Sequence, residues 1–146
     1  MLNGSTPPSA PTTRIAIIVD PSLPIGLLAN TVATLSIGLG AAEPRFGNTV
    51  LTDREGRSIH NSADRPVPIL QATPEVIRSL LLTALASPLA GTVVAFPQFA
   101  RSLHAFEDYL QKFPQTDLAQ ETIDGLALAG SERWVKSLTG NLRLLR

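Results

Sequence analysis

Two short runs of aliphatic and β-branched residues predict the centre of a sheet. The first, Arg14–Asp20, is almost wholly apolar and ends where Pro21 follows it. The second, Gly91–Phe96, ends at Pro97. Apolar runs of this length, bounded by proline or glycine, are typical of buried strands. We therefore predict that both are central strands.

The segment between Leu27 and Leu39 contains no charged residue, which predicts one long apolar helix. Pro24 precedes it, where a missing backbone N–H costs nothing. Gly40 follows it in a position suited to a left-handed helix cap, and Pro44 prevents continuation. Because a helix that is apolar nearly all round is usually buried, we expect this helix to lie in the core.

The other elements follow from local patterns. We expect a hairpin over 48–61 with its turn at 53–56, and a short strand over 67–72, which Pro68 places either at an edge of the sheet or at the start of the strand. We expect a helix that starts at the cap Thr73 and ends before Pro88, and a helix capped by Ser102 that runs through Phe113. A strand over 122–129, a helix capped by Ser131 and ended by Gly140, and a tail over 141–146 that docks on the body complete the chain. Alternating strands and helices predict an α/β sandwich with a mixed, mostly parallel sheet.

Composition limits the classes of protein to consider. The 146 residues suit one domain, which we place at 14–146 behind a disordered tail at 1–13. Twelve basic and twelve acidic residues cancel, which argues against nucleic-acid binding. Only 16% of the residues are charged, which favours extensive burial and a homodimer interface. The absence of cysteine, of a signal peptide and of a long enough apolar span predicts a cytoplasmic protein without membrane association.

No catalytic motif is present in the sequence. The glycines at Gly38 and Gly40 end a predicted helix, whereas a dinucleotide-binding fingerprint opens one. His60 and His104 lack the spacing of metal ligands, so we expect no metal and no cofactor. We name no catalytic residue and lean against an enzyme.

The best candidates for a ligand-binding site are polar residues in the apolar helix. Asn30, Thr31 and Thr34 lie within it, and Asn30 and Thr34 are four residues apart on one face. Gln98 follows the second strand, whose carboxyl end should lie nearby. These side chains either line a small-ligand pocket, or bond the backbone or face a dimer partner instead.

Several stretches together resemble a known family. They are 17–31, the strand 93–96, and the segments 126–130 and 138–145, which contain the Pro-x-Gly-x-x-Ala-Asn start of the helix and the Leu-Thr-Gly-Asn-Leu ending. They resemble the uncharacterised bacterial family DUF2000, which in turn is similar to type II peptidyl-tRNA hydrolases. This resemblance implies a three-layer peptidyl-tRNA hydrolase II-like α/β fold, with a four-stranded mixed sheet between helices and a dimeric assembly.

The hydrolases' functional residues do not carry over. Their helix opens with Gly-Lys, and the position of that lysine is Leu27 here; their strand ends in an aspartate, and that position is Ala95. Their glutamine and histidine correspond to Thr31 and Thr34. The resemblance therefore implies a related fold without the hydrolase chemistry.

The leading hypothesis is a non-hydrolytic small-ligand-binding module lined by Asn30, Thr31, Thr34 and Gln98. One alternative is a peptidyl-tRNA hydrolase-like esterase with a rearranged site, for which Lys136 or Arg101 would supply the missing cation. A dimeric interaction protein is the other.

Overall fold

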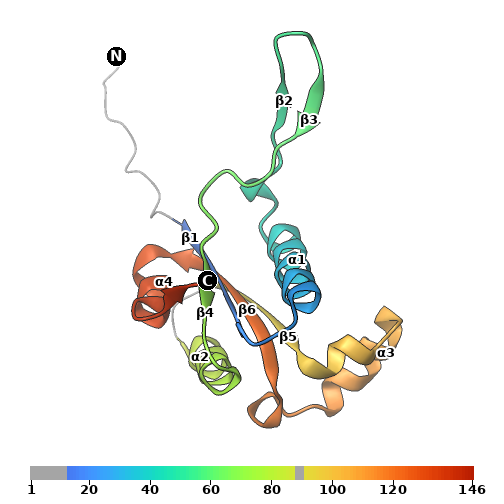
Figure 1. Ribbon diagram of the computed structural model, residues 1–146, viewed down its shortest axis with the longest axis vertical. Coiled ribbons are helices and arrows are strands. Elements are labelled where there is room, and N and C mark those ends of the chain that lie inside the picture. The colour runs from blue at the N-terminus through green and yellow to red at the C-terminus, as the bar shows by residue number, and fades with distance from the viewer. Residues whose placement is uncertain (1–12, 88–90) are drawn as a thin grey trace, which may run out of the picture.

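The protein is an α/β sandwich of three layers, seen in a computed structural model that describes residues 13–87 and 91–146 (Figure 1). The disordered tail expected at 1–13 lies outside the described residues except for Thr13, which begins the first strand. One face of the central sheet carries one long helix, and the other face carries two.

The central sheet has five strands in the order β5-β6-β1-β4-β7. Their bounds are β1 Thr13–Val19, β4 Ile69–Gln71, β5 Gly91–Pro97, β6 Ile123–Ser131 and β7 Arg143–Leu144. β1 is parallel to β4 and antiparallel to β6, and β5 and β7 are each antiparallel to their neighbours. The sheet is mixed, as expected, but it is mostly antiparallel rather than mostly parallel, because only the β1–β4 pair is parallel. It has five strands rather than four because the docked C-terminal tail forms β7.

The position of β5 differs from its prediction as a central strand. It lies at an edge of the sheet and pairs only with β6, and its residues from Thr92 to Phe96 are half-buried. The most buried strands are β1 and β6, which pair along the whole of β1 from Thr13 to Val19 and are buried except at the end where β1 begins. An apolar run shows that a strand is shielded from water, but it does not show whether a second strand or a helix provides the shield.

The helices are α1 Ile25–Ala42 on one face of the sheet, α2 Pro74–Ala86 and α4 Glu132–Thr139 on the other, and α3 Phe106–Lys112 beside β5. Two predicted caps are confirmed, since Thr73 Oγ1 accepts from Val76 N–H and Ser131 Oγ accepts from Trp134 N–H. Short 3-10 turns occupy 44–46, 98–102, 113–115 and 118–120.

The predicted cap at Ser102 is wrong. α3 starts four residues later, and Ser102 Oγ donates instead to Phe99 O within the 3-10 turn that follows β5. The sequence also predicts that Leu103, Phe106, Leu110 and Phe113 form an apolar stripe along this helix. In the structure most of this stripe does not pack on the core, and Phe106 is 72% exposed.

The long helix α1 departs most from expectation. It runs past Gly40 to Ala42 with no left-handed residue, so the predicted glycine cap is wrong. Only Thr31, Leu35 and Leu39 are buried, and Ile25 is 86% exposed. A single helix layer on one side of a sheet buries only one face, so an apolar composition on the other faces leaves apolar surface exposed.

Within the described residues, α1 is the one helix long and apolar enough to cross a membrane, with 18 residues and a mean hydropathy of 1.6. Its buried stripe, however, packs against β1, β5 and β6 as part of the sandwich. The packing is that of a layer of the domain.

The predicted hairpin is confirmed as β2 Val50–Thr52 and β3 Ser58–His60. Gly56 in its turn has φ +85°, a conformation that glycine adopts most easily. The hairpin forms a sheet of its own and projects from the body as an arm (Figure 1).

Candidate functional site

An ion pair with a buried carboxylate and a partly exposed arginine lies at the end of the sheet where β1 and β5 finish. Asp20 follows β1, and Asp124 lies on β6 with 1% of its surface exposed. Arg101, in the turn after β5, donates from Nε to Asp124 Oδ2 at 2.5 Å and from Nη2 to Oδ1 at 2.6 Å. The bond to Asp124 raises the pKa of Arg101, and burial opposes that rise. The pair joins the turn after β5 firmly to the sheet.

The Asp20 carboxylate is also engaged. Its Oδ1 accepts from Ser22 N–H at 2.9 Å and from Ser22 Oγ at 2.7 Å. The resulting turn leads the chain from β1 towards α1, which begins after Pro24 with no side-chain cap. These carboxylates hold loops in place, and neither is arranged as a general acid or base with a free proton-transfer partner.

Two of the four predicted site residues bond to their own helix. Thr31 is fully buried, its Oγ1 donates to Leu27 O at 2.8 Å, and its methyl group lies over Gly125 of β6. Thr34 Oγ1 donates to Thr31 O at 3.1 Å, yet Thr34 is half-buried and lines a hollow.

The other two predicted residues, Asn30 and Gln98, are exposed and line neither of the hollows beside β5. Neither side chain makes a hydrogen bond in the part of the chain that the structure describes. The four residues therefore do not converge on one cavity, and Thr34 alone lies on a hollow.

The hollow at Thr34 lies between α1, the α1-facing side of β5 and the segment that leads into α3. We call it the α1-side hollow. Its volume is about 520 Å³, and its lining is mostly apolar. Its lining includes Thr34, Ile37, Val94, Phe96, His104 and Tyr109. His104 is exposed, so its imidazole is available to a ligand.

A second hollow of about 590 Å³ lies on the opposite face of β5, against α2; we call it the α2-side hollow. Val94, Phe106 and Tyr109 line both hollows. Tyr109 also stacks on Phe99 with ring centroids 5.7 Å apart, and burial raises the pKa of its phenol. The helical spacing of Phe106 in the sequence indicated an apolar helix face, but it did not indicate Tyr109, and it could not show that this face borders an open groove.

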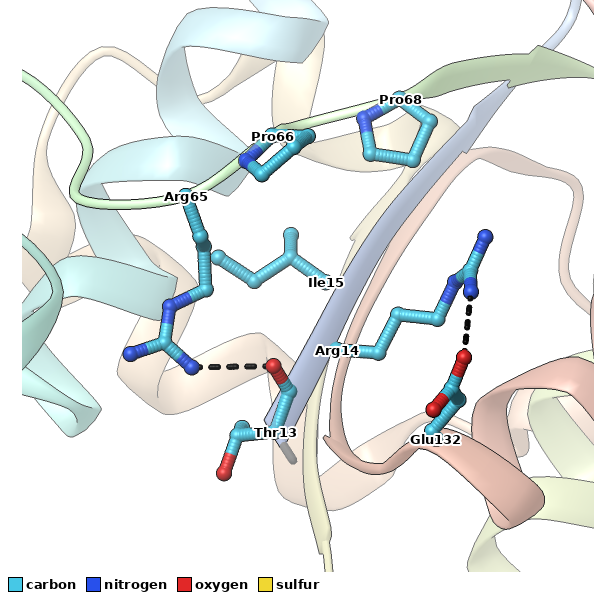
Figure 2. Close-up of a pocket in the computed structure, with 7 residues that line it drawn as sticks. All are labelled: Thr13, Arg14, Ile15, Arg65, Pro66, Pro68 and Glu132. Atoms are coloured by element: carbon cyan, nitrogen blue, oxygen red, sulfur yellow. Dashed lines mark hydrogen bonds and ion pairs between the residues drawn. The ribbon is translucent and has the colours of Figure 1, made fainter. Parts of the chain in front are cut away.

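A third, smaller pocket lies at the other end of the sheet, where β1 begins (Figure 2). Arg14 extends from β1 to Glu132 with Nη1–Oε1 at 3.2 Å, while Arg65 donates from Nη1 to Thr13 O at 2.9 Å. Its volume is about 240 Å³, and both arginines are already paired with carboxylates, Arg65 with Asp64. It offers a ligand less room and no unpaired charge.

The comparisons with known proteins identify a family but no activity. No curated protein matches the chain. A solved structure described as a protein of unknown function, Atu0240 from Agrobacterium tumefaciens strain C58, is similar, with a TM-score of 0.82 and 19% identity over 90% of this chain and 96% of that one. At this identity the likeness shows the fold alone. A family model described as protein of unknown function (DUF2000) matches residues 13–146, so the chain belongs to the DUF2000 family.

Proposed function

We propose that this protein is a non-hydrolytic binding module that takes a small, largely apolar ligand in the α1-side hollow. The observation that carries this proposal is the volume and lining of that hollow. About 520 Å³ falls within the range of small-molecule sites, roughly 300–1,000 Å³. Its apolar lining carries three side chains with polar groups, Thr34, His104 and Tyr109, which can orient a ligand.

The proposal assigns different roles to the four predicted residues. Thr34 is the direct contact, because its oxygen keeps a free lone pair for a ligand donor. Thr31 supports it from the buried side of α1. Asn30 and Gln98 are exposed polar groups that a ligand extending beyond the hollow could reach.

We also propose that the fold is related to type II peptidyl-tRNA hydrolases. The order of the first strand, long helix and C-terminal ending supports this relationship. Leu27 stands half-buried in the first turn of α1, and Ala95 lies half-buried on β5. Neither can position or polarise an ester, which favours binding without hydrolysis.

The esterase alternative needs a replacement cation, and both candidates are engaged elsewhere. Arg101 is bound through two nitrogens to Asp124. Lys136 Nζ lies 2.7 Å from Glu132 Oε1, and Glu132 also binds Arg14. Arg14 is at the start of β1, whereas the first turn of α1 lies near the other end of that strand. This geometry favours the binding module over a rearranged hydrolase.

We further propose that the protein forms a homodimer through the exposed face of α1. The exposed surface of α1 includes two large apolar side chains, Ile25 and Ile37, and Ile25 lies outside the α1-side hollow. α1 carries no charge from Ile25 to Ala42, so two copies could pack it together without like-charge repulsion. Sedimentation tests this: Ile25→Glu should shift a dimer towards monomer, whereas a wild-type monomer at tens of micromolar would contradict it.

Binding of N-phenylnaphthylamine, an uncharged fluorescent probe, tests the binding proposal. The probe should bind the wild type. Thr34→Phe fills part of the α1-side hollow, so it should weaken binding by about tenfold because the probe loses part of its apolar contact area there. The matched control is Ala33→Phe, which adds the same ring at the exposed neighbouring position. Equal affinity in all three proteins would overturn the proposal.

A further inference from the structure

The free edge of β5 presents unpaired main-chain groups. Asp20 N–H donates to Asp124 O, which fixes the alternation along β6: its even-numbered residues bond to β1, and its odd-numbered residues bond to β5. The register then pairs β6 with the even-numbered residues of β5, such as Val94. The N–H and C=O groups of Val93 and Ala95 therefore face away from the sheet.

This edge lacks the protection that edge strands usually carry. The stretch from Thr92 to Phe96 has no charged residue and no proline, and its first irregularity comes only between Phe96 and Pro97. Natural proteins usually blunt such an edge with charge, proline, a bulge or a covering segment. An uncharged, regular and half-exposed edge is suited to pairing with another strand.

The two hollows lie on opposite faces of this same edge. Val94 and Phe96 pack on the α1 face of the sheet, and Val93 and Ala95 pack on the α2 face. The hollows have similar volumes, about 520 and 590 Å³. Successive side chains of a strand point to opposite faces of its sheet, so a strand laid along β5 would place alternate side chains in alternate hollows.

Helix α3 bounds the groove on the side away from β5. Phe106 and Tyr109 line both hollows, so the helix borders the two hollows together. The lining of both hollows contains no Asp, Glu, Lys or Arg, and His104 is its one basic side chain. An occupant therefore meets apolar surface on both faces and main-chain donors and acceptors along β5.

We propose that the occupant is a short extended peptide with uncharged, mainly apolar side chains, which adds to β5 as a sixth strand of the sheet. This inference rests on the proposed binding function and names the class of ligand. Strand addition to an exposed edge draws affinity from main-chain hydrogen bonds and specificity from pockets for alternate side chains. A compact molecule would fill one hollow and leave Val93 and Ala95 unpaired.

A single peptide fits this groove better than a second copy of the chain. A second copy pairing edge to edge would bring its own α3 and the rest of its sheet to the place that α3 already occupies. An extended peptide brings only one strand between β5 and α3. The experiment must therefore also detect a second copy of the chain that covers this edge.

The test uses a fluorescein-labelled peptide of alternating valine and alanine, with a short lysine tail for solubility. Two further peptides carry N-methyl groups on one or the other set of alternate amides. Strand addition predicts that one methylated set loses affinity by about tenfold or more, the value of roughly two hydrogen bonds, while the other set keeps most of it. Equal affinity of the two methylated peptides would overturn the inference.

The matched protein variants are Ala95→Pro and Ala95→Val. Because Ala95 N–H faces away from β6, proline there removes a groove donor without breaking the ladder, and edge strands tolerate proline. Valine keeps the N–H and enlarges the side chain. Peptide affinity should fall about tenfold in Ala95→Pro and much less in Ala95→Val, with thermal unfolding of both recorded as a control.

The remaining outcomes separate the two proposals. If N-phenylnaphthylamine binds in a manner that depends on Thr34 but the peptide does not bind, the inference fails and the binding module stands. If neither probe binds, both fail. Hydrogen exchange at the amides of Val93 and Ala95 is measured without peptide at several protein concentrations. If these amides become more protected as the dimer fraction rises, a second copy covers the edge, and the peptide inference is overturned.

Discussion

Arg101 and Asp124 form a two-pronged ion pair that joins the turn after β5 to the amino end of β6. Both bonds are short, at 2.5 and 2.6 Å, and the Asp124 side chain is 1% exposed while the Arg101 side chain is 30% exposed. The turn that Arg101 secures leads directly into α3, which bounds the groove. This pair therefore determines where α3 starts relative to β5.

Arg101→Ala should destabilise the protein strongly, because it leaves the buried Asp124 carboxylate without its cation. Breaking a buried pair costs about 3–5 kcal/mol, and the partial exposure of Arg101 places the expected loss near the lower end, at about 3 kcal/mol. Urea unfolding followed by the fluorescence of Trp134, the one tryptophan in the sequence, measures it.

The control replaces both partners with apolar side chains of similar size, Arg101→Met with Asp124→Leu. This double variant should recover most of the lost stability, because no buried charge is left unpaired. If Arg101→Ala lowers the free energy of unfolding by less than about 1 kcal/mol, water or another group must solvate the Asp124 carboxylate, which would contradict its burial.

The features that the sequence predicted correctly depend on local chemistry. The hairpin could be predicted because its turn contains Asp53, whose side chain accepts backbone hydrogen bonds, and Gly56, which adopts a left-handed conformation. Thr73 and Ser131 could be predicted as helix caps because a cap also acts locally: each side-chain oxygen accepts from a backbone N–H three residues further along the chain.

The features that it missed depend on pairing across the chain. The edge position of β5 follows from the strand order, which brings β6 between β5 and β1. The Arg101–Asp124 pair joins residues 23 positions apart. Thr34 was a candidate from the sequence because a polar residue in an apolar helix needs a partner. Tyr109 and His104 became candidates only from the structure, in which they line the same hollow as Thr34.

Gly125→Ala should destabilise the contact between β6 and α1. A Cβ at this position would lie 2.7 Å from Thr31 Cγ2 and 2.8 Å from Leu35 Cδ1. Overpacking of a filled core costs about 1–3 kcal/mol, measurable by urea unfolding. Gly26→Ala is the matched control, because a Cβ there meets nothing within 4 Å and alanine favours a helix by up to about 1 kcal/mol.

The role of Thr31 is tested in the same background. Thr31→Ser keeps the hydroxyl that bonds Leu27 O but removes the methyl group that Gly125→Ala would strike. Combined with Gly125→Ala, it should restore part of the lost stability. If it restores none, the packing of Thr31 against β6 is not what limits the size of residue 125.

The hairpin arm should be separable from the rest of the protein. β2 and β3 pair only with each other, and Val50, Leu51 and Ile59 are all exposed. Replacing 50–60 with a two-glycine link between Thr49 and Asn61 should change the free energy of unfolding by less than about 1 kcal/mol, since surface segments contribute little. The affinity for N-phenylnaphthylamine should stay the same. A large loss of stability would show that the arm packs on the body, and a large loss of affinity would show that the arm contributes to the groove.

Tyr109 offers a direct readout of the groove, because it is the one tyrosine in the sequence and lines both hollows. Burial raises its pKa above the ordinary value of 10.0. A raised pKa favours the protonated phenol in the folded state, so its stabilising effect is complete below pH 10 and is lost as the pH rises through the folded pKa. Absorbance of the tyrosinate should therefore appear at higher pH in the folded protein than in urea.

A ligand in the groove should raise the pKa of Tyr109 further, because an apolar occupant removes more water from the phenol. The absorbance titration repeated with saturating N-phenylnaphthylamine, or with the valine–alanine peptide, measures that second shift. Thr34→Phe should abolish the shift caused by the small probe, while Ala33→Phe should not. A folded midpoint equal to that in urea would contradict the burial of the phenol in the free protein, and the absence of a second shift with either probe would contradict binding beside Tyr109.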